Sequence, residues 1–439
     1  MSCPVISVLI PVYNNWELTR ACLEALAASD PGDDTEVLVV DNASTDATPQ
    51  ACPALGRSLF GERFRYLPQP VNRNYAGANN IAAAQARGDW LLLLNNDTLP
   101  QPGWAAPLLR AFDGDPRLGA AGPLLLYPPD KDGLHRVQHL GVVLSQGSRV
   151  SHLYEYLPER HPVVSRPRRL QIITGAALLI PRQRYLTLGG LDEGFINGFE
   201  DVEFCARLCR DDLHQRVIPE ARIIHLAGRS EGRRDSEAAN SARCFRQCRH
   251  LLRMDEPARW RDDGYQPELS PWLTLAPGLP PTVRLRLLRQ AREGLAALTE
   301  AVRGEPLWQE GLLLLARQQE AQGRPGDALE TLTLAARLHS SPETLLPLLA
   351  FVLRMAPEDA RTIALLREEL AGYLITPEAR EARLRALQAE WLDAGEPALA
   401  ARTEALRQDA AAFFAGPHMR LAQALQTDGM PLPSTGHAG

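Results

Sequence analysis

Short apolar segments, rich in β-branched residues, alternate with amphipathic segments along the first 95 residues of the chain. Apolar runs that stop at a proline or an aspartate are typical of buried parallel strands. Apolar positions that recur every three or four residues indicate helices. Strands are expected at residues 5–10, 36–40, 64–67 and 89–94, and helices at residues 16–28 and about 76–86. This order predicts an α/β fold with a doubly wound sheet, whose ligand lies at the carboxyl ends of the strands.

Polar residues follow three of these strands, at the point where the chain leaves the sheet. They are Pro11–Asn15 after the first strand, Asp41–Asp46 after the second and Asn95–Thr98 after the fourth. Asn, Asp and Ser in such places also form turns and cap helices, and capping is the expected role of Ser44 or Thr45. Because neighbouring parallel strands end at the same edge of a sheet, the three segments together predict a binding site.

The class of ligand follows from what these segments contain and lack. The first strand is not followed by GxGxxG, which disfavours a dinucleotide site, and no GxxxxGK[ST] occurs, which excludes a P-loop. The carboxylate of Asp41 can accept a hydrogen bond from a base or a ribose hydroxyl. Asp97 can hold a hard divalent cation that bridges phosphates. A nucleoside diphosphate bound with Mg²⁺ or Mn²⁺ fits both residues.

Six segments carry a family resemblance through their order and spacing. They are VISVLIPVYNN at 5–15, VLVVDNASTDAT at 37–48, NRNYAGANN at 72–80, LLLLNNDTLP at 91–100, ITGAALLIPR at 173–182 and GFEDVEFCARL at 198–208. Together they resemble the inverting glycosyltransferases of family 2, especially the rhamnosyltransferase-like branch. The resemblance covers about residues 4–230. It implies a GT-A fold, which is a Rossmann-like and mostly parallel sheet flanked by helices.

The resemblance implies a nucleotide-sugar site at the strand ends. Asn79 could equally satisfy backbone groups at the start of a helix. Asn95 stands where the family has the first carboxylate of an Asp-x-Asp motif, so its amide can still bind ribose but no metal contact is assigned to it. Gly175 is expected where sugar and acceptor meet and where the backbone approaches closely, or else at a plain strand or helix start. The implied binding residues are Pro11, Val12, Tyr13, Asp41, Asn79, Asn95, Asn96 and Gly175.

The resemblance also implies a divalent cation, Mn²⁺ or Mg²⁺, held by Asp97 and His225. His225 ends the apolar run at residues 222–224, where a histidine is often structural. In this fold a histidine that follows the helix of the general base completes the metal shell. Imidazole, carboxylate and phosphate oxygens together suit Mn²⁺ and are acceptable for Mg²⁺.

The catalytic residues are expected in the segment that contains Glu200 and Asp201. By analogy with the Glu-Asp motif of the family, Asp201 is the general base that takes the proton of the acceptor hydroxyl, and Glu200 orients the acceptor. A helix that begins here places both carboxylates in its first turn, so stabilisation by the helix dipole is the alternative role. Glu203, one turn later, is either a solvated helix residue or a direct participant.

Helical periodicity replaces the strand pattern in the second half of the chain. Residues with the spacing of a tetratricopeptide repeat are Leu312, Ala316, Gly323, Ala328, Leu332, Ala335 and Pro342, and a fainter set is Trp391, Gly395, Ala398 and Ala401. Such a domain binds a protein partner or drives self-association, or else it is a helical cap on the sheet. The expected organisation is a GT-A domain at 1–262, a proline-rich linker at 263–282, an all-α helical-hairpin domain at 283–425 and a disordered tail at 426–439.

Composition limits the classes of binding partner and the cellular compartment that we expect. The 439 residues carry a net charge of −6, which argues against nucleic acid as a partner. The 7 cysteines are thinly spread and the apolar runs are too short to span a membrane, so a cytoplasmic protein with reduced thiols is expected. The pairs Cys205/Cys209 and Cys244/Cys248 have helical spacing, which could form a metal site but more often means two residues that face the core.

A basic face is expected after residue 230. Arg243, Arg246, His250 and Arg253 fall on one side of a helix. This side is either simply solvated or contacts an anionic lipid headgroup, which would place the protein peripherally at the inner face of the membrane.

These observations predict an inverting, metal-dependent glycosyltransferase. It would move a sugar from a UDP- or dTDP-sugar to a glycan, lipid-linked or protein acceptor in bacterial surface polysaccharide or glycoconjugate synthesis. A nucleotidyltransferase is an alternative, but PVYNN lacks its Gly/Arg/Lys-rich phosphate loop. A catalytically inactive scaffold, whose helical domain binds a protein, is the other alternative, and the joint presence of Asp97, Asp201 and His225 counts against it.

Overall fold

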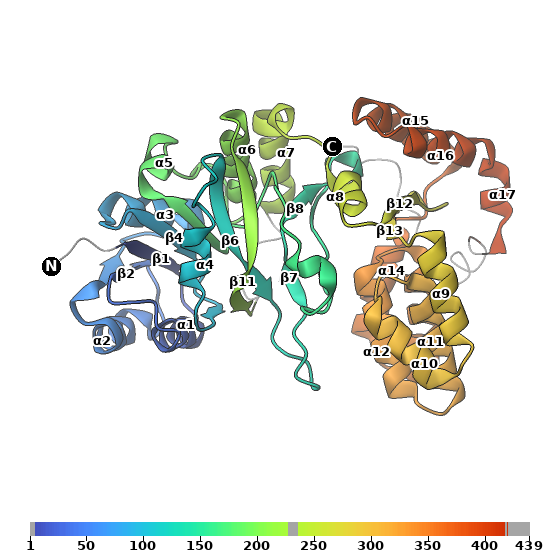
Figure 1. Ribbon diagram of the computed structural model, residues 1–439, viewed down its shortest axis with the longest axis horizontal. Coiled ribbons are helices and arrows are strands. Elements are labelled where there is room, and N and C mark those ends of the chain that lie inside the picture. Colours follow the sequence, from blue (N-terminus) through green and yellow to red (C-terminus); the bar gives the residue numbers. More distant parts are fainter. Residues whose placement is uncertain (1–4, 227–235, 418, 420–439) are drawn as a thin grey trace. The chain divides into compact units, whose positions relative to one another are not determined.

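The computed structural model describes residues 5–226, 236–417 and 419. The chain divides into two compact units (Figure 1). The N-terminal unit contains residues 1–144 and 150–253, and the C-terminal unit contains residues 145–149 and 254–439. The expected tail at 426–439 lies outside the described residues.

A nine-stranded sheet forms the centre of the N-terminal unit, in the order β3-β2-β1-β4-β10-β6-β11-β5, with β7 paired to β6. The strands β1 to β4 are parallel, with Val8 of β1 opposite both Val37 and Leu92. The strand β10 joins this group in the antiparallel direction. The bounds are β1 (Ile6–Val12), β2 (Thr35–Asp41), β3 (Phe64–Pro68), β4 (Trp90–Leu94), β5 (Thr98–Pro100), β6 (Leu118–Leu126), β7 (Val137–His139), β10 (Ala177–Pro181) and β11 (His214–His225).

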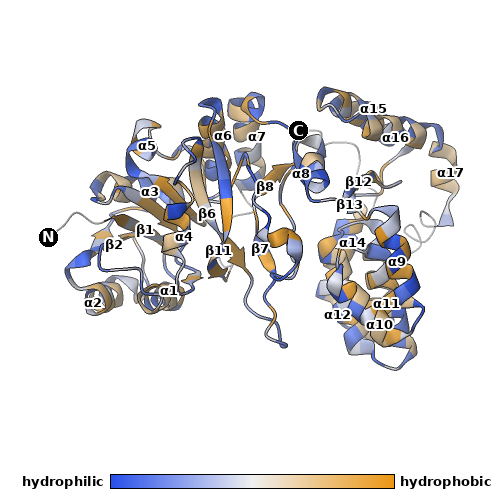
Figure 2. Ribbon diagram, in the orientation of Figure 1, coloured by the Kyte–Doolittle hydropathy of each residue, from blue (hydrophilic) through white to orange (hydrophobic). Residues whose placement is uncertain are grey.

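Helices flank this sheet. Their bounds are α1 (Trp16–Ala28), α2 (Thr48–Phe60), α3 (Asn74–Gln85), α4 (Ala105–Arg110), α5 (Arg182–Thr187), α6 (Glu200–Arg210) and α7 (Glu237–Cys248). The expected α/β fold is therefore confirmed, and α1 occupies the range read from its apolar positions. Cys22, Leu23 and Leu26 of α1 are fully buried in the core against the strands. The strands β1 and β4 are among the most hydrophobic segments of this unit, whereas β11 is hydrophilic over part of its length (Figure 2).

A short hairpin, β8 (Val142–Leu144) and β9 (Val150–His152), follows β7. Its tip, Ser145–Arg149, belongs to the C-terminal unit. The strand β11 is much longer than the apolar run at residues 222–224, because it continues along β6 from His214 with two irregularities in register.

The C-terminal unit begins with α8 (Glu256–Asp262) and a second hairpin, β12 (Gln266–Leu269) and β13 (Leu275–Gly278). This hairpin occupies the range that we expected to be a linker. Its prolines are compatible with strands because Pro267 and Pro277 lie opposite each other in an isolated two-stranded pair. Trp272 and Leu273 at its turn are buried, so the segment contributes to the core of the unit.

The rest of this unit is helical. The helices are α9 (Pro281–Ala291), α10 (Leu295–Gly304), α11 (Gln309–Ala321), α12 (Pro325–Leu338), α13 (Pro342–Met355), α14 (Ala360–Ala371), α15 (Pro377–Asp393), α16 (Pro397–Gln408) and α17 (Ala410–Ala415). Among the described residues, none of the helices combines the length and the apolar character needed to cross a bilayer.

The first set of repeat-like residues lies where the spacing predicts. Six of its members are buried along α11, α12 and the start of α13, and Gly323 forms the turn after α11 with a φ of 72°. In the fainter set, two of the four residues lie as the spacing predicts and two do not. Trp391 is buried and Gly395 makes the turn, but Ala398 and Ala401 are exposed, whereas Leu399 and Ala400 face α15 and the core. The buried face of α16 is formed by Leu399, Ala400, Thr403 and Leu406 instead.

Candidate active site

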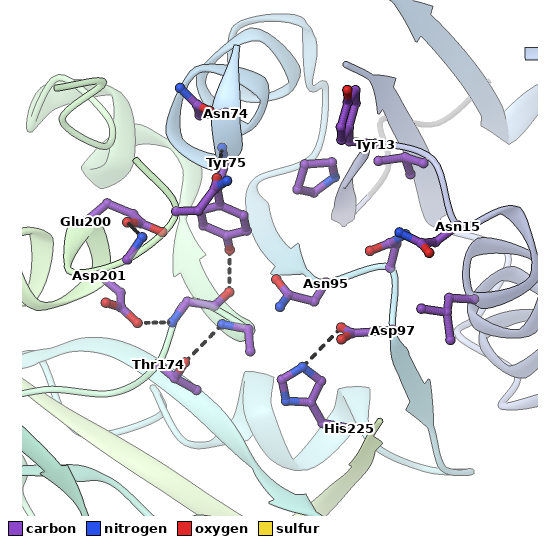
Figure 3. A pocket seen from close by; sticks show the side chains of 18 of the residues that line it. Tyr13, Asn15, Asn74, Tyr75, Asn95, Asp97, Thr174, Glu200, Asp201 and His225 are labelled. Atoms are coloured by element: carbon purple, nitrogen blue, oxygen red, sulfur yellow. Dashed lines mark hydrogen bonds and ion pairs between the residues drawn. The ribbon is translucent and has the colours of Figure 1, made fainter. Parts of the chain in front are cut away.

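A cavity of about 640 Å³ opens at the carboxyl ends of β1 and β4, where the strand order predicts a ligand (Figure 3). Segments far apart in the sequence line it, including Pro11–Asn15, Asn95–Asp97, Thr174–Ala176, Gly198–Asp201 and His225. Among the described residues, none that lines the cavity is Lys or Arg. Within the described lining, the side chains able to carry positive charge are histidines.

Hydrogen bonds between two loops shape one end of the cavity. The backbone N–H of Asn14 donates to Ser44 Oγ at 2.8 Å, and the N–H of Thr45 donates to Asn14 Oδ1 at 2.7 Å. Asp46 accepts from the N–H groups of Trp16 and Thr48. The expected capping role of Ser44 or Thr45 is therefore wrong, because both residues join the loops instead and Asp46 serves the start of α2.

The residues Pro11, Val12 and Tyr13 line this end of the cavity, as the sequence predicts. The ring of Tyr13 is 50% exposed, which is unusual for a large aromatic side chain and leaves its face open to a flat ligand. Asn42, which the sequence analysis did not single out, also lines the cavity. Its Oδ1 accepts from the N–H of Arg73 at 3.1 Å, so it ties the end of β2 to the start of α3.

Two of the expected binding residues do not line the cavity. Asp41 is buried, and its carboxylate accepts from the N–H of Ser44 at 2.8 Å and from the hydroxyl of Tyr66. Asn79 is fully buried on α3, where its Nδ2 donates to the carbonyl of Tyr75 at 3.0 Å. Their polar groups shape the walls of the site from behind, and no contact with a ligand follows from their positions.

The segment after β4 presents its three polar residues in different directions. The side chain of Asn95 points into the middle of the cavity (Figure 3). Asn96 lines the cavity, but its Nδ2 donates to Thr19 Oγ1 of α1 at 2.9 Å. Asp97 is buried, and its Oδ1 lies 3.0 Å from His225 Nε2. The structure thus brings together the two expected metal ligands, which lie 128 positions apart in the sequence.

Gln138 of β7 fixes the orientation of the His225 ring. Its Nε2 donates to the carbonyl of His225 at 3.2 Å, so its Oε1 accepts from His225 Nδ1–H at 2.5 Å. In a neutral ring the proton is on Nδ1, and the lone pair of Nε2 then points toward the Asp97 carboxylate. Either a proton on Nε2 or a cation bound to both groups satisfies this contact, and the arrangement fits a divalent metal with Gln138 as its outer-shell partner.

The protein alone offers an incomplete metal shell. Within the described part of the chain, no group of three or more His, Cys, Asp or Glu side chains is placed to hold a metal ion. Asp97 and His225 supply two ligands, so the remaining positions would be filled by phosphate oxygens and water.

Asp201 stands on the other side of Asn95, in the first turn of α6 (Figure 3). Its Oδ2 accepts from the N–H of Gly175 at 2.9 Å, and its Oδ1 accepts from the N–H of Val202 at 2.9 Å. The hydroxyl of Tyr75 donates to the carbonyl of Gly175. Desolvation, followed by the charges of Glu200 and Asp201, raises the pKa of Tyr75 well above its usual value, so the hydroxyl keeps its proton. Gly175 is therefore held between two residues of the cavity wall.

The other acidic residues of α6 are fixed by local contacts. Glu200 lines the cavity and accepts from the N–H of Gly198 at 2.6 Å. Glu203 does not line it, because its carboxylate forms a two-point pair with Arg207 at 2.8 Å. The residues Asn197 and Phe199 adopt left-handed backbone angles immediately before this helix. Asn197 Oδ1 accepts from the N–H of Tyr75 at 3.1 Å, which joins α3 to the start of α6.

The cysteine pairs and the basic face lie apart from this cavity. The thiols of Cys205 and Cys209 donate to backbone carbonyls, and Cys244 lies 3.2 Å from Cys248 with both thiols reduced. The residues Arg246, His250 and Arg253 are exposed. Arg243 differs from the expected solvated or lipid-facing role, because it pairs with Asp192 at 2.9 Å and packs over the ring of Phe195.

Sequence reasoning missed the residues that support the site rather than form it. Gln138 lies in a stretch without any recognised motif, so no local signal could have found it. Tyr75 lies inside the NRNYAGANN segment that carries the resemblance, although its hydroxyl was not assigned a role.

The chain was compared with known proteins. Residues 7–183 match the Glycosyl transferase family 2 model. The chain is 30% identical over 285 residues to the N-acetylglucosaminyl-diphospho-decaprenol L-rhamnosyltransferase of Mycobacterium tuberculosis, and the match covers 58% of this chain and 88% of that protein. It is 33% identical over 230 residues to the O-antigen biosynthesis protein RfbC of Myxococcus xanthus, where it covers 51% of this chain and 17% of the relative.

Coverage of the relatives is uneven. The chain spans 17% of the length of the Myxococcus xanthus protein and 29% of a further relative from Sinorhizobium fredii. Among solved structures, the mannosyltransferase PcManGT from Pyrobaculum calidifontis in complex with GDP-Man and Mn²⁺ aligns with a TM-score of 0.41 at 18% identity, covering 85% of this chain and 86% of that chain.

Proposed function

Because the chain belongs to glycosyl transferase family 2, we propose that it moves one sugar from a nucleoside-diphosphate donor to an acceptor hydroxyl with inversion at the anomeric carbon. One observation carries this proposal. The carboxylate of Asp201 and the Asp97–His225 pair open into the same cavity, with Asn95 between them (Figure 3). A single displacement needs a base and a site for the leaving diphosphate on opposite sides of the sugar.

The nucleotide occupies the end of the cavity formed by Pro11, Val12 and Tyr13. The half-exposed ring of Tyr13 stacks on the base, and the amide of Asn95 binds the ribose or the sugar. Asn42 is a better candidate than Asp41 for a contact with the nucleoside, since only Asn42 lines the cavity.

Asp97 and His225 hold a divalent cation, Mn²⁺ or Mg²⁺, together with the diphosphate of the donor. When bound, this ion supplies positive charge that stabilises the departing diphosphate. The need for it follows from the charge of the site, because the described lining includes no Lys or Arg to neutralise a diphosphate. Gln138 holds the His225 ring in its orientation through Nδ1 and the backbone carbonyl, which directs Nε2 at the ion.

Asp201 takes the proton from the acceptor hydroxyl as this oxygen attacks the anomeric carbon. The N–H groups of Gly175 and Val202 hold the carboxylate in one orientation, and each of its oxygens keeps a second lone pair for the incoming proton. A general base placed in this way contributes about 10²–10⁴-fold to the rate. Glu200 orients the acceptor, since it lines the same part of the cavity and is itself fixed by Gly198.

The relatives suggest the type of donor and acceptor. We expect a deoxyhexose or hexose carried by dTDP or UDP and an acceptor that is a glycan, a lipid-linked glycan or a glycosylated protein, as in bacterial surface polysaccharide synthesis. A lipid-linked acceptor would require the enzyme to act at the inner face of the membrane. The helices of the C-terminal unit are the candidate surface for a protein partner or for self-association.

A donor panel tests the proposal. The full chain is incubated with Mn²⁺ and with UDP-, dTDP- or GDP-sugars in turn, and the release of nucleoside diphosphate is measured. Slow hydrolysis of one donor that disappears in EDTA and in Asp97→Ala is expected. NMR of the released sugar before mutarotation should show inverted configuration. No release across the panel, or retained configuration, contradicts the proposed function.

A further inference from the structure

The cavity has a second polar wall, formed by Tyr127, His152 and Glu155. Tyr127 follows the end of β6, and His152 ends β9. None of the three residues has a role in donor binding or proton transfer as described above. We refer to these three residues as the second wall.

Glu155 is held at one oxygen and open at the other. The hydroxyl of Tyr127 donates to Glu155 Oε1, whereas Oε2 has no hydrogen-bond partner within the described part of the chain. Desolvation, followed by this hydrogen bond, raises the pKa of Tyr127, so its hydroxyl remains a donor. The ring of Tyr127 stacks on Tyr156 with a centroid distance of 5.0 Å and an interplanar angle of 4°. The carboxylate is thus attached to a rigid aromatic pair.

The backbone around Glu155 is in an unusual conformation. Tyr154 and Tyr156 have φ values of 56° and 67°, which bulky residues rarely adopt. Hydrogen bonds from Leu153 N–H to Gly141 at 2.9 Å and from Tyr156 N–H to Val137 at 2.7 Å maintain this turn. These hydrogen bonds therefore stabilise a strained turn, and its middle residue, Glu155, lines the cavity.

The proton positions of the neighbouring histidines follow from a backbone donor. The N–H of Thr174 donates to His139 Nε2 at 3.2 Å, so this nitrogen carries no proton. His139 is fully buried, and desolvation lowers its pKa well below the usual value, so its one proton is on Nδ1. This Nδ1–H donates to His152 Nδ1 at 2.9 Å, which leaves the proton of a neutral His152 on Nε2. The contact with His139 fixes the orientation of the His152 ring.

We propose that the second wall binds the acceptor, and that the part of the acceptor next to the reacting hydroxyl is a neutral, hydroxyl-rich sugar ring. The inference rests on the proposed glycosyl transfer. A carboxylate accepts from sugar hydroxyls, and an aromatic ring offers a flat apolar face to a sugar ring.

The charge of the cavity disfavours an anionic acceptor at this place. Glu155, Glu200 and Asp201 all line it, and the described lining offers no Lys or Arg as a counter-charge. A carboxylate or phosphate next to the reacting hydroxyl would be repelled by these three carboxylates in a partly desolvated site.

The test uses the full chain and a panel of methyl glycosides of neutral hexoses, deoxyhexoses and N-acetylhexosamines, with methyl glucuronide and a hexose 6-phosphate as anionic probes. Binding is followed by saturation-transfer NMR, and transfer is followed with the donor that the hydrolysis panel selects. We expect at least one neutral glycoside to bind and to accept the sugar, and the anionic probes to do neither. Glu155→Gln, which can still accept from Tyr127, should raise the KM for this acceptor about tenfold and lower the ratio of transfer to hydrolysis by a similar factor.

Matched variants separate the possible outcomes. Tyr127→Phe should raise the same KM by a smaller factor, and Glu220→Gln at an exposed carboxylate of β11 should leave it unchanged. A kcat loss in Glu155→Gln at constant acceptor KM overturns the proposal, as does equal binding of the anionic probes or the absence of any neutral glycoside that binds. Neutral glycosides whose saturation transfer depends on Glu155 support the second wall even if the donor panel fails, so the two failures are distinguishable.

Discussion

The backbone N–H of Gly175 donates to Asp201 Oδ2 at 2.9 Å, so the carboxylate that we propose as the general base is positioned by a residue 26 positions away in the chain. The space around this contact is limited. A Cβ atom on Gly175 would lie 3.2 Å from the Tyr75 hydroxyl and 3.4 Å from Asp201 Cβ. A side chain at this position therefore competes with the residues that hold the carboxylate.

Substitution of Gly175 tests this arrangement. Gly175→Ala should lower kcat about tenfold at nearly unchanged donor affinity, because the added methyl group crowds the Tyr75 hydroxyl and a shift of Gly175 by a few tenths of an ångström moves the N–H that holds Asp201. The double variant Gly175→Ala/Tyr75→Phe removes the nearest atom and should recover part of the loss relative to Tyr75→Phe alone. Gly326→Ala on α12, where a Cβ meets no atom within 4 Å, is the control for the substitution itself.

Asp201→Asn removes the base and keeps the shape of the side chain. Transfer should fall by about 10²–10⁴-fold, while donor affinity measured by calorimetry stays near the wild-type value. The amide oxygen can still accept from Gly175, so the fold of the site is retained. Asp211→Asn at the exposed end of α6 serves as the control. A variant at position 201 that keeps most of its kcat would show that Asp201 is not the base.

Asp97→Ala removes one of the two protein ligands that we assign to the cation. Nucleoside diphosphate should then bind with the same low affinity with and without Mn²⁺, because the ion bridges the protein and the phosphates. Calorimetric titrations of the wild type and of the variant, each in the presence and absence of Mn²⁺, give this comparison. An unchanged Mn²⁺ effect in the variant would refute the assignment.

Gln138 gives a subtler prediction, since it acts only through His225. Gln138→Leu should weaken Mn²⁺ binding in the presence of nucleoside diphosphate by about 10–100-fold, as is usual for an outer-shell partner of a ligating histidine. The kcat at saturating Mn²⁺ should change much less than the apparent Mn²⁺ affinity. Loss of activity that excess Mn²⁺ does not restore would mean that Gln138 serves the fold rather than the metal site.

The C-terminal unit should be sensitive to acid through His339. Burial lowers the pKa of this histidine to about 4, compared with about 6.5 in an unfolded chain. The neutral ring is favoured in the folded state, so its contribution is complete above pH 6.5 and is lost as the pH falls toward 4. Urea unfolding followed by circular dichroism gives the free energy of unfolding at pH 7.5 and at pH 4.5. Between these two pH values, the decrease in this free energy should be about 2–3 kcal/mol smaller for His339→Leu than for the wild type. Equal losses in the two proteins would contradict the buried neutral state.

Local sequence patterns were sufficient for the framework of the N-terminal unit. Runs of β-branched residues gave the first parallel strands, and the polar segments after them pointed to the edge where the cavity opens. This works because the alternation of strand and helix and the shared edge of neighbouring strands depend on residues close in sequence. The linker expected at 263–282 rested on proline content alone, and the buried Trp272 and Leu273 show why composition was a poor guide there.

Side-chain partners were decided only by the tertiary structure. Asp41 and Asn42 are adjacent at the end of β2, yet Tyr66 and Ser44 withdraw the first from the cavity while the second lines it. Gln138 meets His225 across 87 positions, and no spacing rule connects them. The sequence by itself determined the class of fold, the family and the types of residue at the strand ends. Which of these residues reach the ligand depended on contacts between distant segments, because each polar group in a crowded site binds whichever partner the packed chain places within about 3 Å.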